Sequence, residues 1–412
     1  MSQVVPFRAL RPQKAFASQV AARPYDVLDV TEARQVVRDN PLSFLHVEKS
    51  EIDVPDAAGV EDLRIYERAR DNLRKLRDEG VLAQDPAPVF YLYCQRMAGR
   101  TQTGIVACVS VAEYRAGQIR RHEWTRADKE RERTLHVDTV GAQTGPVFLT
   151  YHGQARIDRL MAEVMDQCPE YDFLASDGVA HTVWVIADPA VIREVEAGFA
   201  AVEALYIADG HHRAAAATTV AALRDARLGE GRGEQGWMLA VLFPHNQLRV
   251  MDYNRAVRDL NGLSPSAFLE RVRAEGFLIS EPFSEKSPGQ ACEFGMYLGG
   301  RWYRLTARPE IRRDDDAVAG LDVSLLQEAL LAPILGIGDP RTDSRISFIG
   351  GIRGMAELER LVDSDGYAVA FSLYPPTIEQ MMAVADTGRV MPPKSTWFEP
   401  KLLSGLFVHL LE

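Results

Sequence analysis

The sequence contains little cysteine and no nucleotide loop of the Walker type. Its four cysteines, spread over 412 residues, form no C-x-x-C pair and show no zinc-ligand spacing, which argues against a disulfide framework and a metal knuckle. No G-x-x-x-x-G-K-[ST] pattern occurs, so any phosphate site must be built differently. The cysteines are Cys94, Cys108, Cys168 and Cys292.

Long apolar runs and an excess of basic residues are also missing. No segment approaches the roughly 18 consecutive apolar residues of a membrane-spanning helix, and the N-terminus has no apolar core of signal-peptide type. The formal net charge is −11, and basic residues are interleaved with acidic ones. We therefore expect a soluble, cytoplasmic protein with no membrane partner, and nucleic acid is not an expected partner.

What is present is an α/β pattern of alternating predicted strands and helices. Apolar residues make up 46% and charged residues 25% of the chain, as in folded globular proteins, and the length indicates two or three domains. A strand is predicted at Ser43 to Val47, a long charged helix at Glu61 to Glu79, and a final helix after the loop at 390–401. The glycine-rich stretch 229–236 is the clearest linker. We predict three regions, 1–115, 116–232 and 237–412.

The most informative stretch runs from Ala208 to Arg213. An apolar run from Ala204 gives way there to an alanine-rich helix, which predicts a strand, a turn at Gly210 and a helix start. The first N–H groups of a helix attract anions. The side chains of Asp209, His211, His212 and Arg213 could hold a phosphate, transfer a proton or order a metal ion. The alternative is a polar helix cap with a core histidine.

Two further clusters could contribute chemistry. Thr125 and Asp128 predict an acidic capping box, which leaves His122 and Glu123 in the loop before that helix. A carboxylate near a phosphate site can be a general base or a metal ligand, and an exposed loop acid is the alternative. Near the end of the chain, Lys394, Ser395 and Thr396 follow two prolines and could bind phosphate oxygens. An ordinary surface loop is the alternative there.

In this order the clusters resemble those of the free-serine kinase family, whose archaeal member phosphorylates serine at the expense of ADP and whose core has the ParB/sulfiredoxin fold. His122-Glu123 falls at that family's Pro-His-Glu position, 209–213 matches its Asp-Gly-His-His-Arg turn, and 393–396 resembles its Pro-Lys-Thr-Thr loop. Nearly the whole chain also resembles the bacterial group called domain of unknown function 1015. Motifs that carry this second resemblance lie at 6–12, 24–26 and 348–351.

The resemblance implies a ParB/sulfiredoxin-like core at 116–232, with an N-terminal α/β extension and a C-terminal α/β domain. It implies a small-molecule kinase that uses ADP or ATP, with Mg²⁺, to phosphorylate free serine or a similar metabolite. No residue is assigned as a metal ligand. The implied catalytic residues are Glu123, Asp209 and His211, the implied phosphate- or nucleotide-binding residues are Gly210, His212, Arg213, Lys394, Ser395 and Thr396, and His122 is implied to bind the substrate.

The chain departs from the kinase motifs at three positions, where Arg121 precedes His122, Ser395 replaces a threonine and Trp397 replaces an arginine. These departures concern the acceptor more than the phosphate chemistry. The alternative function is a ParB-like nucleotide-binding regulator of DNA segregation or transcription without kinase activity. That alternative predicts a basic surface, and the acidic balance of the chain argues against it.

Overall fold

The computed structural model describes residues 2–229 and 233–412 of the chain. The chain forms two compact units: unit 1 comprises Met1–Leu248 and Pro400–Glu412, and unit 2 comprises Arg249–Glu399. Both contain helices and sheets, so the predicted mixed α/β class is confirmed. Residues 230–232 of the predicted linker lie outside the described residues, and the rest of 229–236 lies inside unit 1.

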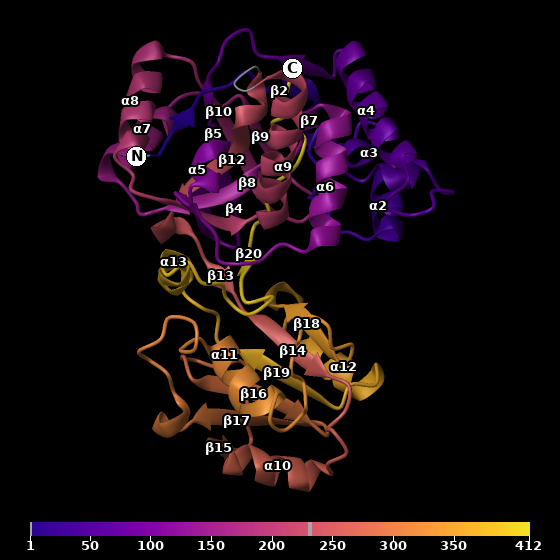
Figure 1. The fold of residues 1–412 in the computed structure, drawn as a ribbon, viewed down its shortest axis with the longest axis vertical. Helices are drawn as coiled ribbons and strands as arrows, with labels where there is room; N and C mark the ends of the chain where they lie inside the picture. The colour runs from indigo at the N-terminus through magenta and orange to yellow at the C-terminus, as the bar shows by residue number, and fades with distance from the viewer. Residues whose placement is uncertain (1, 230–232) are drawn as a thin grey trace. The chain divides into compact units, whose positions relative to one another are not determined.

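Unit 1 is built on a nine-stranded mixed sheet, as traced in the described chain (Figure 1). Strands from both sides of residue 115 share this sheet, so the two units divide the chain differently from the three predicted regions. Across the sheet the strands are β6 (Ile119–Arg120), β11 (Leu205–Asp209), β8 (Val147–Tyr151), β12 (Trp237–Pro244), β5 (Arg100–Ser110), β4 (Phe90–Met97), β10 (Ala180–Ile186) and β9 (Tyr171–Leu174), and β1 (Val4–Val5) pairs with β5.

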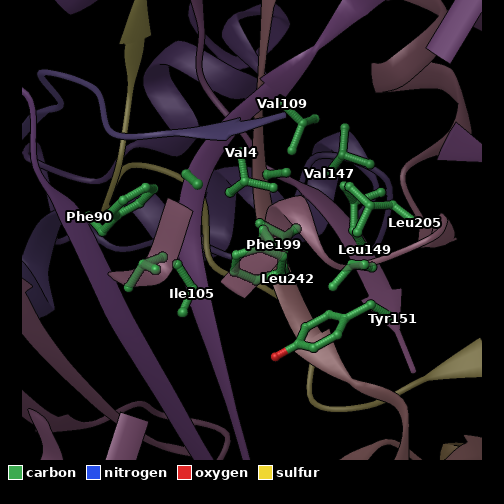
Figure 2. Close-up of a cluster of buried hydrophobic side chains, with 14 of the residues drawn as sticks. Val4, Phe90, Ile105, Val109, Val147, Leu149, Tyr151, Phe199, Leu205 and Leu242 are labelled. Atoms are coloured by element: carbon green, nitrogen blue, oxygen red, sulfur yellow. The ribbon is translucent and has the colours of Figure 1, made fainter. Parts of the chain in front are cut away.

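The core of unit 1 lies against this sheet. Alternate residues of β8 and of its neighbours point to one face, where Val147, Leu149 and Leu242 join Phe199 in a single buried cluster (Figure 2). Every residue of β8 is buried, as expected for a strand covered on both faces. The helices of unit 1 are α1 (Ala17–Val20), α2 (Val30–Val37), α3 (Leu45–Glu48), α4 (Leu63–Asp78), α5 (Val111–Arg115), α6 (Ala127–Val140), α7 (Ala155–Met165), α8 (Pro189–Ala200) and α9 (His211–Leu228).

A second cluster of unit 1 joins its N-terminal helices to its last residues. Leu45 of α3 and Leu73 of α4 pack in one buried cluster with Val140 of α6 and Val408. Two short ladders accompany this cluster: β2 (Leu10–Pro12) pairs with β3 (Leu82–Gln84), and β7 (Ala142–Gln143) pairs with β21 (His409–Leu410). The N-terminal region and the C-terminal segment are therefore integral parts of unit 1.

Two sequence predictions in this region are wrong. Ser43 to Val47 is not a strand, because it leads into helix α3, where Phe44, Leu45 and Val47 are buried together. Residues 400–412 form no final helix, because Gly405 has φ 85° and the chain is extended up to β21. The segment is nevertheless part of the core, since Leu406 and Phe407 are buried.

Unit 2 contains a six-stranded antiparallel sheet with α12 (Met355–Ser364) packed on one face, where Leu358 and Leu361 join the cluster of Ala256, Trp302 and Ala370. Its strands, in order, are β15 (Phe277–Ser280), β17 (Arg301–Ala307), β16 (Glu293–Leu298), β19 (Val369–Leu373), β14 (Tyr253–Val257) and β18 (Ile346–Gly350), and β13 (Val250–Met251) pairs with β20 (Trp397–Phe398). Its helices are α10 (Pro265–Ala274), α11 (Asp322–Leu326), α12 (Met355–Ser364) and α13 (Ile378–Asp386).

Among the described residues, none of the helices combines the length and the apolar character needed to cross a membrane.

Candidate functional site

The predicted strand, turn and helix around Gly210 are present. Strand β11 ends at Asp209, Gly210 has φ 92°, and α9 begins at His211. A Cβ on Gly210 would lie 3.2 Å from Arg213 Nε and 3.5 Å from the backbone of Val147, so glycine suits both the conformation and the space. Gly210 offers no side chain to cap the first N–H groups of α9, and these groups are the part of a helix that binds anions.

An ion pair precedes the turn. Lys401 Nζ donates a hydrogen bond of 2.9 Å to Asp209 Oδ2, and Gly210 N donates one of 2.8 Å to Oδ1. Burial by itself raises the pKa of Asp209, but the charges of Lys401 and Arg213 and these hydrogen bonds outweigh it and hold that pKa below its usual range. Asp209 is therefore an anion at neutral pH. Lys401 is the last residue of the loop predicted at 390–401, but its role as the partner of Asp209 was not predicted.

Strand pairing brings His122 to the same place. Strand β6 runs parallel to β11, with Ile119 opposite Leu205 and Arg120 opposite Tyr206. The ends of parallel strands meet at one edge of a sheet, so the loop after β6 lies beside the turn after β11. The rings of His122 and His211 stand at 87° with their centroids 4.6 Å apart.

The two histidines are neutral at physiological pH. They are 1% and 6% exposed, and burial lowers the pKa of His122 to about 4. Burial, with a smaller contribution from His122, holds the pKa of His211 well below its usual value. A neutral imidazole can accept a proton or bind a metal ion through its unprotonated nitrogen.

Glu123 completes a compact cluster with these two rings. Each of the three residues offers one ligand atom, and these three atoms lie within 4.8 Å of one another. Glu123 is only half-buried. The cluster combines two imidazoles with one carboxylate, whereas Mg²⁺ prefers oxygen ligands. These three residues are thus a poor match for Mg²⁺, and we derive no step that depends on the protein holding that ion.

His212 and Arg213 are tied to neighbouring loops of unit 1. His212 Nε2 accepts a hydrogen bond of 3.1 Å from the backbone N–H of Arg126, just before α6. Arg213 Nη1 donates to the carbonyl oxygen of Pro146, in the loop before β8. A guanidinium has five N–H donors, so this contact uses only part of the capacity of Arg213 to bind an anion.

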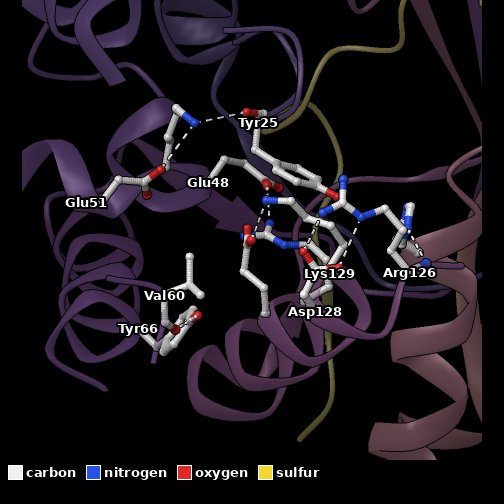
Figure 3. A network of polar contacts seen from close by, with 12 residues as sticks. Tyr25, Glu48, Glu51, Val60, Tyr66, Arg126, Asp128 and Lys129 are labelled. Carbon is white, nitrogen blue, oxygen red and sulfur yellow. Dashed lines mark hydrogen bonds and ion pairs between the residues drawn. The ribbon is translucent and has the colours of Figure 1, made fainter. Parts of the chain in front are cut away.

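Helix α6 is held in place by buried charges (Figure 3). Arg133 Nη1 lies 3.3 Å from Glu48 Oε2, and the guanidinium carbon lies 3.8 Å from the centre of the Tyr25 ring. This network connects α6 to α3 and so fixes one end of the loop that carries His122 and Glu123. The predicted capping box at the start of α6 is wrong, because Arg126 occupies the cap position and its guanidinium pairs with Asp128 at 2.7 Å.

Lys394, Ser395 and Thr396 belong to unit 2. Ser395 Oγ donates a hydrogen bond of 2.6 Å to the Pro392 carbonyl oxygen, and Arg255 Nη2 donates one of 3.0 Å to that of Lys394. Lys394 is exposed and has φ 56°. Whether this loop acts together with the turn at Gly210 stays a prediction.

The model of a family described as "Protein of unknown function (DUF1015)" matches residues 4–324. No curated protein matches the chain.

Solved structures give only distant similarities. A free serine kinase in complex with AMP is 14% identical, with 71% of this chain and 86% of that chain covered and a TM-score of 0.36. SbnI with a C-terminal truncation, from Staphylococcus aureus, is 12% identical, with 74% and 87% covered and a TM-score of 0.39. A conserved hypothetical protein from Pyrococcus furiosus is 14% identical, with 74% and 95% covered and a TM-score of 0.36. Similarities this low do not assign an activity.

Proposed function

The chain belongs to the DUF1015 family, and from this premise we propose that it is a small-molecule kinase that transfers a phosphoryl group from ADP or ATP to the hydroxyl of free serine or a similar metabolite. The observation that carries the proposal is the convergence, within unit 1, of Glu123 and two neutral imidazoles on the glycine-led start of α9. This arrangement combines an anion site with a proton acceptor. The identity of serine as the acceptor rests on the resemblance of the sequence motifs alone.

Nucleotide binding would depend on the positive charge near the turn at Gly210. The N–H groups at the start of α9 and the guanidinium of Arg213 would bind phosphate oxygens of the nucleotide. Asp209 and Lys401 form an ion pair beside them, which limits the net charge at the turn. If Mg²⁺ accompanies the nucleotide, it would supply neutralisation of phosphate charge, and no residue of this chain is assigned to hold it.

In the chemical step the acceptor hydroxyl oxygen attacks the terminal phosphorus, and the bond from that phosphorus to the bridging oxygen breaks. The hydroxyl proton passes to the Glu123 carboxylate, and the leaving nucleotide keeps the electrons of the broken bond. We assign Asp209 and His211 to the catalytic set with Glu123, His212 to binding the phosphate, and His122 to binding the substrate. Lys394, Ser395 and Thr396 would close over the phosphate. In such reactions the protein contributes mainly by positioning groups and neutralising charge.

Calorimetry with ADP, ATP and CTP, with and without serine, tests the binding part. We expect ADP or ATP to bind, and Arg213→Ala to weaken that binding about tenfold or more, because a charged hydrogen-bond donor is lost. Arg227→Ala, an exposed arginine near the other end of α9, is the matched control and should bind like the wild type. Equal nucleotide affinity in Arg213→Ala, confirmed as folded by circular dichroism, would refute the phosphate assignment.

The chemical part is tested by phosphorus NMR of the reaction with serine and other hydroxyl compounds. Glu123→Gln should still bind nucleotide but lower the turnover number about 100-fold or more, because an amide cannot accept the hydroxyl proton. Wild-type turnover in this variant would show that Glu123 is not the base. Nucleotide binding without transfer to any hydroxyl compound, above all with a preference for CTP, would favour the nucleotide-binding regulator.

A further inference from the structure

The His122, Glu123 and His211 cluster has the composition of a transition-metal site. The three residues come from two segments, the loop after β6 and the start of α9, which only the fold brings together. Their ligand atoms lie within 4.8 Å of one another. In a tetrahedral zinc site, with bonds of about 2.0–2.1 Å, ligand atoms are about 3.3 Å apart. Small side-chain rotations would close this difference.

An independent observation comes from the ring of His211. The ring is 6% exposed, and within the described part of the chain its Nε2 atom has no hydrogen-bond partner. A buried polar atom without a partner is uncommon in native proteins and calls for an explanation, such as an ion. A metal ion bound at this nitrogen would satisfy it.

The surroundings orient the cluster for metal binding. A hydrogen bond links the His122 ring to the backbone of Ile207. Metal-binding histidines commonly use one ring nitrogen in this way, which fixes the orientation of the other. The carboxylate of Asp209 lies close enough to act on both rings, but Lys401 already pairs with it, so the negative charge offered to a cation comes from Glu123.

We propose that His122, Glu123 and His211 bind one divalent first-row transition-metal ion, such as Mn²⁺, Fe²⁺, Co²⁺ or Zn²⁺. Two imidazoles and one carboxylate suit these ions and leave coordination positions open for water, a hydroxyl or a phosphate oxygen. The inference goes beyond the proposed kinase activity and does not depend on it. The two assignments are compatible, because a carboxylate that binds an ion through one oxygen keeps a second oxygen that can accept a proton.

The test uses Co²⁺ and Zn²⁺ with the full-length protein, free of nucleotide and serine. Calorimetry should give one ion per chain, and Co²⁺ should produce a visible absorption band. Separate His211→Ala and Glu123→Gln variants should each weaken Co²⁺ binding about 100-fold or more, since changes even to residues behind a ligand cost 10- to 100-fold. His152→Ala, which removes an exposed histidine of unit 1 outside the cluster, is the control and should bind Co²⁺ like the wild type.

X-ray absorption on the Zn²⁺-loaded wild-type protein covers the case in which a variant does not fold. Two imidazole ligands and one carboxylate oxygen would support the site, whereas a zinc shell without two imidazoles would overturn it. Absence of stoichiometric binding to the wild type, or wild-type affinity in His211→Ala, would also overturn it. The two proposals can fail separately. Stoichiometric Co²⁺ binding without phosphoryl transfer would refute only the kinase proposal. Phosphoryl transfer in metal-depleted buffer that contains Mg²⁺, by a protein that does not bind Co²⁺, would refute only the metal site.

Discussion

At the scale of single residues, a buried acid in unit 2 has an unusual environment. Asp322, at the start of α11, is 9% exposed and accepts a hydrogen bond of 2.8 Å from the backbone N–H of Cys292. Its other oxygen is buried without a hydrogen-bond partner among the described residues. Burial, only partly offset by that hydrogen bond, raises the pKa of Asp322 to about 7. The folded protein therefore binds this proton more tightly than the unfolded chain does.

Asp322→Asn should therefore change how the stability of unit 2 depends on pH. The contribution of a carboxyl group with a raised pKa is fully present below the unfolded value of about 4 and is lost as the pH rises through about 7. The side chain of the variant cannot ionise. As the pH rises across this window, the free energy of unfolding of the variant should therefore increase relative to that of the wild type by up to about 1.4 kcal/mol per pH unit. Urea unfolding of both proteins from pH 4 to pH 8 measures the difference, and parallel pH profiles would contradict the assignment.

Residue-level prediction succeeded where the signal is local. The turn from Asp209 to Arg213 can be predicted because glycine and the alanine-rich helix are neighbours in sequence. The contact between His122 and His211 could not be predicted in the same way, since it depends on the parallel pairing of β6 with β11. No local pattern indicates that Lys401 pairs with Asp209, although a lysine after Pro400 stood within a cluster already noted for its polar groups.

At the scale of elements, the start of α9 depends on one glycine. Gly210→Ala should cost about 1–2 kcal/mol of stability, because an L-residue is strained at φ 92° and its Cβ would contact Arg213. It should also weaken nucleotide binding, because the first turn of the helix would shift. Urea unfolding and calorimetry measure both effects.

Gly236→Ala is the control for this substitution. A Cβ at Gly236 would meet no atom within 4 Å, and its φ lies outside the left-handed region. The control should leave the free energy of unfolding within about 0.5 kcal/mol of the wild type. If Gly210→Ala is equally neutral, the turn does not require glycine.

Elements were predicted best where a long pattern supports them. The helix expected at 61–79 is present as α4, Leu63–Asp78, because its apolar residues recur at helical spacing. The segment 43–47 was mispredicted because five residues are too few to separate a strand from a helical turn. The capping box failed because Asp128 pairs with the Arg126 side chain instead of capping the helix.

At the scale of the whole molecule, unit 1 is discontinuous in sequence. Its last segment, Pro400–Glu412, contributes β21 and the buried Leu406, Phe407 and Val408. The resemblance of the motifs implied that the loop at 390–401 folds back to act with the turn at Gly210, but no pattern indicated that residues 400–412 complete unit 1, because that depends on long-range packing. The three regions predicted from the sequence followed the composition signal of the glycine-rich stretch at 229–236, whose described residues lie within unit 1.

Removal of residues 400–412 should therefore destabilise unit 1 and abolish nucleotide binding. Burial of each large apolar side chain contributes about 1.5–3 kcal/mol to the free energy of unfolding. The loss of several such side chains therefore amounts to a large part of the total free energy of unfolding of an ordinary domain. Thermal unfolding followed by circular dichroism measures the loss. Lys401→Met in the full chain separates the two effects, since it keeps the packing but removes the partner of Asp209. A truncated chain with the wild-type melting temperature would contradict this role.

The return of the chain to unit 1 also has a consequence for how the protein is made. Lys401 is 192 positions beyond Asp209, so the ribosome must synthesise all of unit 2 before the ion pair at the turn can form. Until then the strand that pairs with β7 is missing and the apolar surface around Val140 is uncovered. A nascent chain that stalls within unit 2 therefore carries the Asp-Gly-His-His-Arg segment in an incomplete unit, and Asp209 gains its ion-pair partner only after residues 400–412 have been synthesised.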